Sequence, residues 1–197
     1  CGFRLSMRHY HHMRVTGLDH VPAREPVIIA ANHTSHLDVL AILAALPWRT
    51  AGRTCAVAAE DYFFTSAARS VLTRSVVDCI PIDRNGRSAR GLHLCAGRLR
   101  QGGNVIFFPA GTRSADGGIG PFKAGVVAVS RGCRVLVLPC AVTGTFDSLP
   151  RDRLLPRPTP IVLQFGAPVC FAAADFAGLS HEDAALLLET RVREMLR

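Results

Sequence analysis

The fold class is decided by one stretch of the sequence, Val27-Ile28-Ile29-Ala30-Ala31-Asn32-His33-Thr34-Ser35-His36-Leu37-Asp38. Its first five residues form an apolar run, which predicts a strand buried in a sheet. Residues 37–46 predict a helix that ends where Pro47 follows it. A buried strand that leads into a helix is the repeating unit of α/β proteins.

The same alternation continues along the chain. Further strands are predicted at 54–58, 77–82, 105–108, 135–142 and 161–165. Further helices are predicted at 63–76, 87–100, 125–131 and 182–196. This order indicates an α/β fold with a mixed, largely parallel sheet flanked by helices. The length of 197 residues fits a single domain over 1–197, and the start at Cys1 rather than Met predicts a fragment of a longer polypeptide.

The composition argues against several classes of protein. No apolar run reaches the roughly 18 residues that span a bilayer, since the best candidate, 126–138, is interrupted by Arg131 and Arg134. Any membrane anchor is therefore expected before Cys1. Seven Cys without a C-x-x-C pair indicate reduced thiols rather than a disulfide framework or a zinc site.

The net charge of +8 favours anionic partners, such as phospholipid headgroups, coenzyme A or an acidic carrier protein. Nearly all of the positive charge is Arg, with Lys123 as the only Lys, so a composition bias of the genome is an alternative explanation. Nucleic acid is not expected as a partner, because basic and aromatic residues do not interleave and no known nucleic-acid-binding module is present.

His33 and Asp38 are the first candidates for chemistry. His33 follows a buried strand, where a side chain can emerge into a cleft, and Asp38 lies five residues later. Five residues of a regular helix rotate by about 140°, so the two side chains meet only if His33 lies in the turn before the helix. Ser35 as the N-cap, with Asp38 in the capping-box position, supports that arrangement. A carboxylate on one imidazole nitrogen leaves the other nitrogen able to take a proton from a hydroxyl.

A purely structural explanation of the same residues stays open. Asp38 can simply cap the helix, with His33 as a loop histidine whose hydrogen bonds are satisfied. His36 is a rival base, although it lies only two residues from Asp38 and is expected on the outer side of the first turn.

Three further stretches carry polar residues next to predicted strands. The strand at 105–108 runs into a Pro-Ala-Gly turn, where Gly111 lets backbone N–H groups approach a ligand and Arg113 offers a planar fork for phosphate. Arg84 likewise follows an extended segment, and Pro139 indicates that its apolar strand is an edge or carries a bulge. Taken singly, the segment after 105–108 can be explained as a turn followed by a solvated Arg, and the strand with Pro139 as core structure.

Together, in this order and spacing, the four stretches resemble the glycerophosphate/lysophospholipid acyltransferase family, the PlsC-like enzymes. The resemblance covers residues 10–170. The first motif, N-H-x-x-x-x-D, is matched by Asn32, His33 and Asp38. The third, F-P-E-G-T-R-S, is matched by Phe108, Pro109, Gly111, Thr112, Arg113 and Ser114. The weaker matches are Arg84 and Gly86 to the second motif, Leu138 and Pro139 to the fourth, and Phe122, Lys123 and Gly125 to an F-K-x-G segment.

The resemblance implies a PlsC-like acyltransferase fold and the transfer of a fatty acyl group from acyl-CoA or acyl carrier protein to a hydroxyl of a lysophospholipid such as lysophosphatidate. It implies that His33 is the general base and that Asp38 orients it. The residues implied to bind substrate are Arg84, Gly111, Thr112, Arg113 and Lys123. Backbone N–H groups around Gly111 are candidates to stabilise the oxyanion. No cofactor and no metal are implied, and the protein is expected peripherally on the cytoplasmic side of the membrane.

One position departs from the family pattern, because Ala110 stands where the third motif has Glu. In the family that carboxylate is linked to acceptor binding. Three explanations are open: a different acceptor, replacement by another carboxylate such as Asp116, or an introduced change that weakens activity.

A noncatalytic lipid- or carrier-binding domain of a larger protein is the alternative function. A Cys-dependent hydrolase is disfavoured, because no Cys lies at an evident strand-to-helix turn.

The sequence leaves four properties open: the acceptor, the choice between coenzyme A and carrier protein, the acyl-chain length and the oligomeric state.

Overall fold

The computed structural model describes residues 2–59, 79–82, 89–150, 153 and 155–197. The strands in this part of the chain form one sheet with the order β1-β7-β6-β2-β5-β3-β4. Their bounds are β1 Arg14–Thr16, β2 Val27–Ala31, β3 Thr54–Ala59, β4 Cys79–Ile82, β5 Asn104–Phe107, β6 Leu136–Thr143 and β7 Val162–Phe165. Neighbouring strands are parallel except for the antiparallel pair β6 and β7. The predicted α/β fold with a mixed, largely parallel sheet is confirmed.

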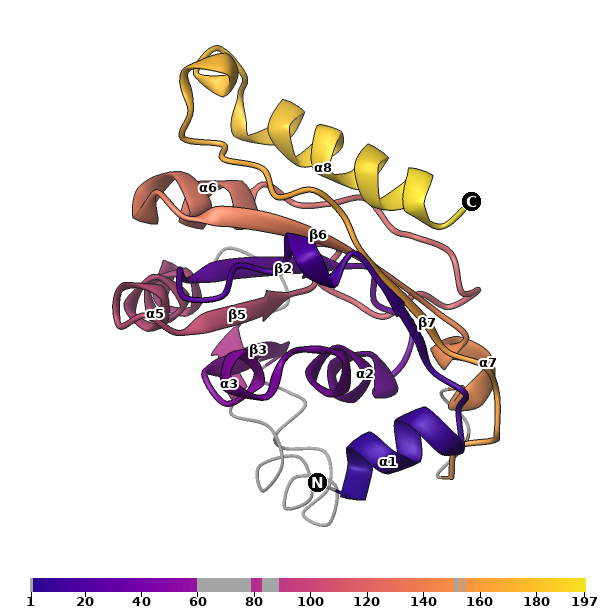
Figure 1. Ribbon diagram of the computed structural model, residues 1–197. Helices are drawn as coiled ribbons and strands as arrows, with labels where there is room; N and C mark the ends of the chain where they lie inside the picture. The colour runs from indigo at the N-terminus through magenta and orange to yellow at the C-terminus, as the bar shows by residue number, and fades with distance from the viewer. Residues whose placement is uncertain (1, 60–78, 83–88, 151–152, 154) are drawn as a thin grey trace.

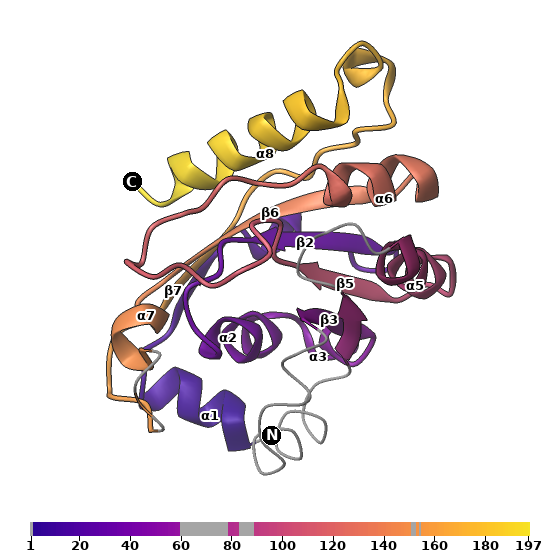
Figure 2. The same cartoon turned by 180° about the vertical axis from the view of Figure 1, so that it is seen from behind.

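Helices cover both faces of the sheet (Figures 1 and 2). One face carries α1 Gly2–His9, α2 Leu37–Ala45 and α3 Trp48–Ala51, and the other carries α5 Ala89–Arg100, α6 Gly125–Cys133 and α8 His181–Met195. Shorter pieces are α7 Thr145–Ser148 and the 3-10 turns η1 Leu18–His20 and η3 Ala174–Phe176.

Strand β2 lies at the centre of the sheet, between β6 and β5. Ile28 and Ala30 pack into the core under α5, α6 and α8, whereas Val27 and Ile29 pack into the core on the side of α1 and α2. A strand covered on both faces has no solvent side, which is why its sequence is a continuous apolar run without alternation. The residues from Asn32 onward therefore lie at the carboxyl end of the central strand, in the middle of that end of the sheet.

The predicted elements match the described ones with a few differences. The predicted helix 63–76 lies outside the described residues, and the predicted strand 77–82 is described only as β4. Strand β5 begins at Asn104, one residue earlier than predicted, because Asn104 pairs with Thr54 of β3. It ends at Phe107, because the carbonyl of Phe108 already accepts a turn hydrogen bond from Gly111.

The expectation that Pro139 lies on an edge strand is wrong, but an irregular pairing does lie beside it. Cys140 pairs with Phe165 and Val137 with Val169, so the segment after β7 has one residue more than β6 across this interval. Strand β6 lies inside the sheet, and its register with β2 runs without interruption through the pair of Ala30 and Pro139. The carbonyl of Pro139 accepts the N–H of Gly166 at 2.9 Å, just beyond the end of β7. Because N and C=O of one strand residue point to the same side, the missing N–H of Pro139 costs the ladder with β2 nothing.

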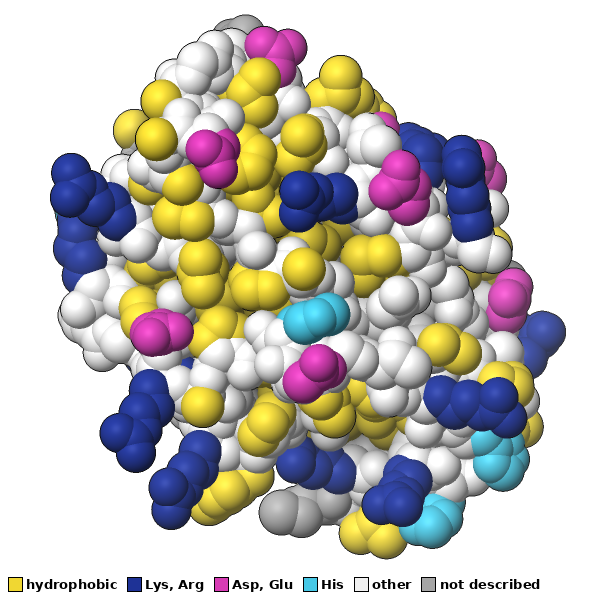
Figure 3. All heavy atoms as spheres, turned by 45° about the horizontal axis from the view of Figure 1, so that its top comes forward, with side chains coloured by type: hydrophobic (Ala, Val, Ile, Leu, Met, Phe, Trp, Pro, Cys, Tyr) yellow, Lys and Arg dark blue, Asp and Glu magenta, His cyan; other side chains and the backbone are white. Residues whose placement is uncertain are grey.

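The surface mixes apolar and basic side chains. On the face drawn in Figure 3, hydrophobic side chains gather in the middle, and most Lys and Arg side chains stand toward the margin. Trp48 and Leu155 are the most exposed large apolar residues of the described part, at 74% and 79%. Among the helices described, none combines the length and the apolar character that a bilayer crossing requires.

Candidate functional site

The residues of the first and third motifs meet at the carboxyl end of the sheet. Strands β2 and β5 are parallel neighbours, so the segments that follow them leave the sheet side by side. The backbone N–H of Ser114 donates to the carbonyl of His33 at 2.8 Å. The ring of Phe108 stacks on the ring of His33, with the centroids 3.9 Å apart and the planes at 17°. Crevices at the carboxyl ends of parallel strands are where α/β proteins bind ligands.

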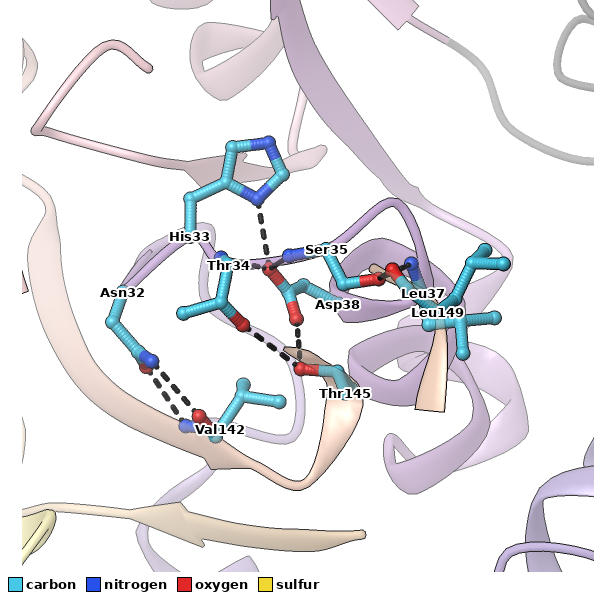
Figure 4. A network of polar contacts seen from close by, with 9 residues as sticks. All are labelled: Asn32, His33, Thr34, Ser35, Leu37, Asp38, Val142, Thr145 and Leu149. Atoms are coloured by element: carbon cyan, nitrogen blue, oxygen red, sulfur yellow. Dashed lines mark hydrogen bonds and ion pairs between the residues drawn. The ribbon is translucent and has the colours of Figure 1, made fainter. Parts of the chain in front are cut away.

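His33 and Asp38 are in contact, as the sequence predicts. The Nδ1 atom of His33 lies 2.8 Å from Oδ2 of Asp38. Asp38 is fully buried, whereas 18% of the His33 side chain is exposed. In Figure 4 the second ring nitrogen of His33 points away from Asp38. The arrangement leaves Nε2 as the nitrogen that can exchange a proton with a bound molecule.

Asp38 receives three further hydrogen bonds. Its Oδ2 accepts the backbone N–H groups of Thr34 at 2.7 Å and Ser35 at 2.9 Å. Its Oδ1 accepts the hydroxyl of Thr145 at 2.5 Å (Figure 4). A buried carboxylate is costly unless its oxygens are hydrogen-bonded, and here both are. Asp38 therefore does more than cap a helix: it organises the turn that carries His33.

The predicted N-cap at Ser35 is one residue early. Helix α2 begins at Leu37 with His36 as its N-cap, because the carbonyl of Ser35 accepts the N–H of Asp38 in a turn that precedes the helix. Parts of the capping box still form, since Ser35 Oγ accepts the N–H of Leu37 at 3.3 Å and Asp38 accepts the N–H of Ser35. The carboxylate of Asp38 contacts His33, and this contact favours His33 over His36 as the base.

Asn32 has a role that the sequence did not reveal. Its side chain donates from Nδ2 to the carbonyl of Val142 at 2.8 Å and accepts the N–H of Val142 on Oδ1 at 2.8 Å. The backbone pairing of β2 with β6 ends at Ala31 and Cys140. The buried amide of Asn32 thus extends the ladder by one rung and fixes the end of β6 beside His33.

Thr145 is the second contributor that the sequence did not reveal. It follows Gly144, whose φ of 83° is left-handed. A Cβ at Gly144 would lie 1.9 Å from the carbonyl oxygen of Pro160. Glycine therefore permits the tight turn after β6 that brings Thr145 under Asp38. A Gly followed by a hydroxyl residue at the end of a buried strand was the available signal.

The turn after β5 is built around Gly111, which has a φ of 78°. Its N–H donates to the carbonyl of Phe108 at 3.0 Å. This N–H is therefore occupied within the turn. In the same segment Thr112 is exposed and Arg113 is half-buried. The N–H of the exposed Lys123 donates to the carbonyl of Pro109 at 3.0 Å.

The structure thus gathers Gly111, Thr112, Arg113 and Lys123 in the segment that follows β5. The segment is joined to the site through Ser114 and His33. Arg84, also predicted to bind substrate, lies outside the described residues.

The position of Ala110 is half-buried, and a Cβ on Gly120 would lie 3.5 Å from the Ala110 methyl group. Asp116, a possible replacement for the missing carboxylate, bonds within its own loop. Its Oδ1 accepts the hydroxyl of Ser114 at 2.7 Å and the N–H of Gly118 at 3.0 Å. The Ser114 hydroxyl, followed by the backbone N–H groups, holds the pKa of Asp116 below its usual value.

Helix α8 holds the far end of the same loop. Glu189 accepts the N–H of Phe122 on Oε2 at 2.9 Å and the guanidinium of Arg193 on Oε1 at 2.7 Å. Arg193 also donates to the carbonyl of Ile119 at 3.2 Å. The predicted amphipathic C-terminal helix therefore also anchors the segment that carries the third motif.

The buried thiols are poor nucleophiles. Burial raises the pKa of Cys95 to about 12, and burial together with the charge of Asp38 raises the pKa of Cys140. Only the thiolate attacks, so neither residue fits a Cys-dependent hydrolase. Within the described ranges, no three His, Cys, Asp or Glu side chains are grouped so that they could hold a metal ion.

Comparison with known proteins gives consistent matches. The model of the Acyltransferase family matches residues 12–143, more than half of the chain. The chain is 28% identical over 149 residues to the chloroplastic 1-acyl-sn-glycerol-3-phosphate acyltransferase LPAT1 of Arabidopsis thaliana, covering 74% of this chain and 40% of the relative. It is 27% identical over 143 residues to a probable 1-acyl-sn-glycerol-3-phosphate acyltransferase of Mycoplasma genitalium, covering 72% and 53%. The chain spans about half the length of these relatives.

The fold has a counterpart among solved structures. The crystal structure of the 1-acyl-sn-glycerophosphate (LPA) acyltransferase PlsC from Thermotoga maritima superposes with a TM-score of 0.78 at 24% identity. The alignment covers 99% of this chain and 76% of the PlsC chain. The predicted PlsC-like fold is confirmed, and the residues matched by the family model include the whole of the His33 to Asp38 segment. This chain belongs to the Acyltransferase family.

Proposed function

We propose that the protein transfers a fatty acyl group from an acyl thioester to a hydroxyl of a lysophospholipid-like acceptor, with lysophosphatidate as the first candidate. The observation that carries the proposal is the contact of 2.8 Å between His33 Nδ1 and a fully buried Asp38. A carboxylate held in this way selects one tautomer and stabilises the imidazolium form, which is the preparation that a general base needs. Several relatives are named as 1-acyl-sn-glycerol-3-phosphate acyltransferases.

In the proposed reaction, Nε2 of His33 takes the proton of the acceptor hydroxyl while the oxygen attacks the thioester carbonyl. The tetrahedral intermediate collapses with formation of the ester C–O bond and cleavage of the C–S bond. The departing thiolate takes the proton from His33 and leaves as a thiol. Asp38 keeps its hydrogen bond to Nδ1 throughout and stabilises the transient positive charge.

The acceptor phosphate is proposed to bind at the segment after β5. Arg113 offers a planar fork for phosphate oxygens and Lys123 a point charge, with Gly111 and Thr112 in the turn between them and the site. Arg84 is proposed from the sequence alone to join them. Both candidate donors, coenzyme A and acyl carrier protein, are anionic, and the net charge of +8 suits either.

A peripheral position on the cytoplasmic side of a membrane is part of the proposal. The mixture of exposed apolar side chains, such as Trp48, with a basic surface suits contact with an anionic lipid surface. The acceptor and the product are both lipids, so this position would shorten their path to the site.

The missing carboxylate at Ala110 favours a second candidate, a weakly active or noncatalytic domain that binds lipid or carrier, or an enzyme for another acceptor. Thiol release from acyl-CoA in the presence of lysophosphatidate separates these possibilities. We expect His33→Ala to lower kcat by about 10²–10⁴. His36→Ala is the matched control, since it removes the neighbouring imidazole that is the rival base, and it should retain most of the rate.

Equal rates for the parent protein and His33→Ala would overturn the catalytic proposal and leave binding as the function. Release of thiol without added acceptor would indicate a hydrolase. Mass spectrometry of the products from a mixed panel of acceptors identifies the acceptor directly.

A further inference from the structure

The buried carboxylate of Asp38 is held from two sides that are far apart in the sequence. The N–H groups that reach Oδ2 belong to the neighbouring residues Thr34 and Ser35. The hydroxyl that reaches Oδ1 belongs to Thr145, which lies 107 residues away in the chain. Thr145 is fully buried and is the first residue of α7. Its oxygen lies 2.5 Å from Oδ1, at the short end of the range for a hydroxyl that donates to a carboxylate.

The proton order in this network follows from the inventory of donors. A threonine hydroxyl has one proton, and that of Thr145 is donated to Asp38. In the hydrogen bond of 3.1 Å between the hydroxyls of Thr34 and Thr145, Thr34 must therefore be the donor and Thr145 the acceptor. The result is a chain of hydrogen bonds from Thr34 through Thr145 to Asp38, and it polarises the Thr145 hydroxyl toward the carboxylate.

The support under Thr145 is rigid. Gly144 takes the left-handed conformation against the carbonyl of Pro160. The two hydrogen bonds between Asn32 and Val142 fix the end of β6 relative to the residue before His33. Thr145 and His33 are thus held in one frame, and Asp38 lies between them.

We infer that Thr145 is a positioning residue for the proposed reaction. Its hydroxyl fixes the rotation of the Asp38 carboxylate, and the carboxylate in turn fixes the tautomer and the direction of the His33 ring. The inference rests on the proposed role of His33 as the base. Thr145 is fully buried, so its effect is expected in the chemical step rather than in substrate binding.

Two substitutions separate the hydroxyl from the shape of the side chain. Thr145→Val keeps the size and removes the donor, and Thr145→Ser keeps the donor. We expect Thr145→Val to lower kcat by about ten- to a hundredfold, by analogy with groups that orient metal-binding histidines through a hydrogen bond. The KM values for the thioester and the acceptor should stay within about twofold. Thr145→Ser should recover most of the lost kcat.

The imidazole signals of ¹⁵N-labelled histidine give a readout that a merely structural role would not move. In the parent protein His33 should show one tautomer, with the proton on Nδ1. In Thr145→Val its signals should show a mixture of tautomers or broaden. The control is Ser148→Ala in the same short helix, since Ser148 is buried and donates to the carbonyl of Arg157 at 2.9 Å. This control should lower the melting temperature and leave the His33 signals and kcat unchanged.

The outcomes are separable. Thr145→Val with parental kcat and parental His33 signals overturns the inference, and so does a loss that appears in KM alone. His33→Ala at the parental rate overturns the proposed function itself, whatever Thr145 does. If Thr145→Val does not fold, Thr145→Cys serves instead, because a thiol is a weak donor. Its kcat should then lie below that of Thr145→Ser, and equal values would also overturn the inference.

Discussion

The backbone N–H of Ser114 donates to the carbonyl of His33 at 2.8 Å. This bond ties the segment that is proposed to hold phosphate to the residue that is proposed to move the proton. Because neither group is a side chain, the tie does not depend on which residues occupy the two positions. The distance between the two halves of the candidate site is therefore set by the fold, and substitutions can change each half separately.

Asp38→Asn should lower kcat by about 10²–10⁴ and also lower the free energy of unfolding. The carboxylate accepts hydrogen bonds on both oxygens, whereas an amide has one acceptor and one donor group. In Asp38→Asn the amide N–H₂ must therefore face groups that are themselves hydrogen-bond donors, which leaves donors opposed without an acceptor. Steady-state kinetics and urea unfolding measure the two effects. Asp147→Asn, an exposed carboxylate on α7, is the control and should change neither.

Asn32→Ala should destabilise the fold by about 2–5 kcal/mol. It leaves the buried N–H and C=O of Val142 without the partners that Asn32 supplies, and each buried unsatisfied group costs about 1–3 kcal/mol. Denaturant unfolding gives the number. Thr143→Ala removes an exposed side chain at the end of the same strand and should be nearly neutral. A neutral Asn32→Ala would mean that the extra rung contributes nothing.

Ala110→Glu should raise kcat/KM for lysophosphatidate, since it restores the carboxylate of the third motif at a half-buried position next to Gly120. Ala110→Gln controls for size. The comparison needs a panel of acceptors. A fall in activity on another acceptor, without a gain on lysophosphatidate, would show that Ala110 belongs to a different specificity.

Stability should fall on the acidic side because of His11. The side chain is buried, and desolvation lowers its pKa from the usual 6.5. A lowered pKa means that the unfolded chain binds this proton more tightly than the folded one. The free energy of unfolding is therefore highest above about pH 6.5 and falls as the pH drops from there through the lowered pKa. Urea midpoints between pH 8 and 5 measure the slope.

In that pH series His11→Gln should show a shallower decline than the parent protein. The exposed His181 provides the control, and His181→Gln should follow the parent. A parental slope in His11→Gln would place the acid sensitivity elsewhere.

Cys95 and Cys140 should react slowly with iodoacetamide at pH 8 in the folded protein. Burial holds the pKa of Cys95 at about 12 and that of Cys140 above its usual value, so little thiolate exists at this pH. The half-buried Cys170 should react faster. Peptide mass spectrometry after timed labelling gives the three rates, and labelling in urea should make them equal.

The parts of the structure that the sequence predicted are those encoded locally. The five apolar residues of β2 and the helix after them were predictable, because burial on both faces leaves a continuous apolar run. The contact of His33 with Asp38 was predictable because it is also local: the two residues are five positions apart and are joined by a single turn. The start of α2 was missed by one residue, because the hydrogen bond from Asp38 N–H to Ser35 belongs to a turn rather than to the helix.

What the sequence did not reveal depends on pairing across the chain. Asn32 reads as part of a motif, but its bonds go to Val142, 110 residues away. Thr145 lies three residues beyond the predicted strand 135–142, but its hydroxyl donates to Asp38. Pro139 misled only about the edge: its strand lies inside the sheet, and the irregular pairing lies on the side of β7, where the missing donor falls. Such facts depend on strand order and register, and spacing alone does not give them.

The distance along the chain between Asp38 and Thr145 also has a consequence for how the molecule is made. A ribosome releases the segment with His33 and Asp38 long before it releases β6 and Thr145. Until those later residues are synthesised and paired, the carboxylate lacks the partner on Oδ1 and the frame that Asn32 and Val142 complete. The nascent chain therefore carries both proposed reactive residues without the order that makes them a pair, and that order arrives only when β6 joins the sheet.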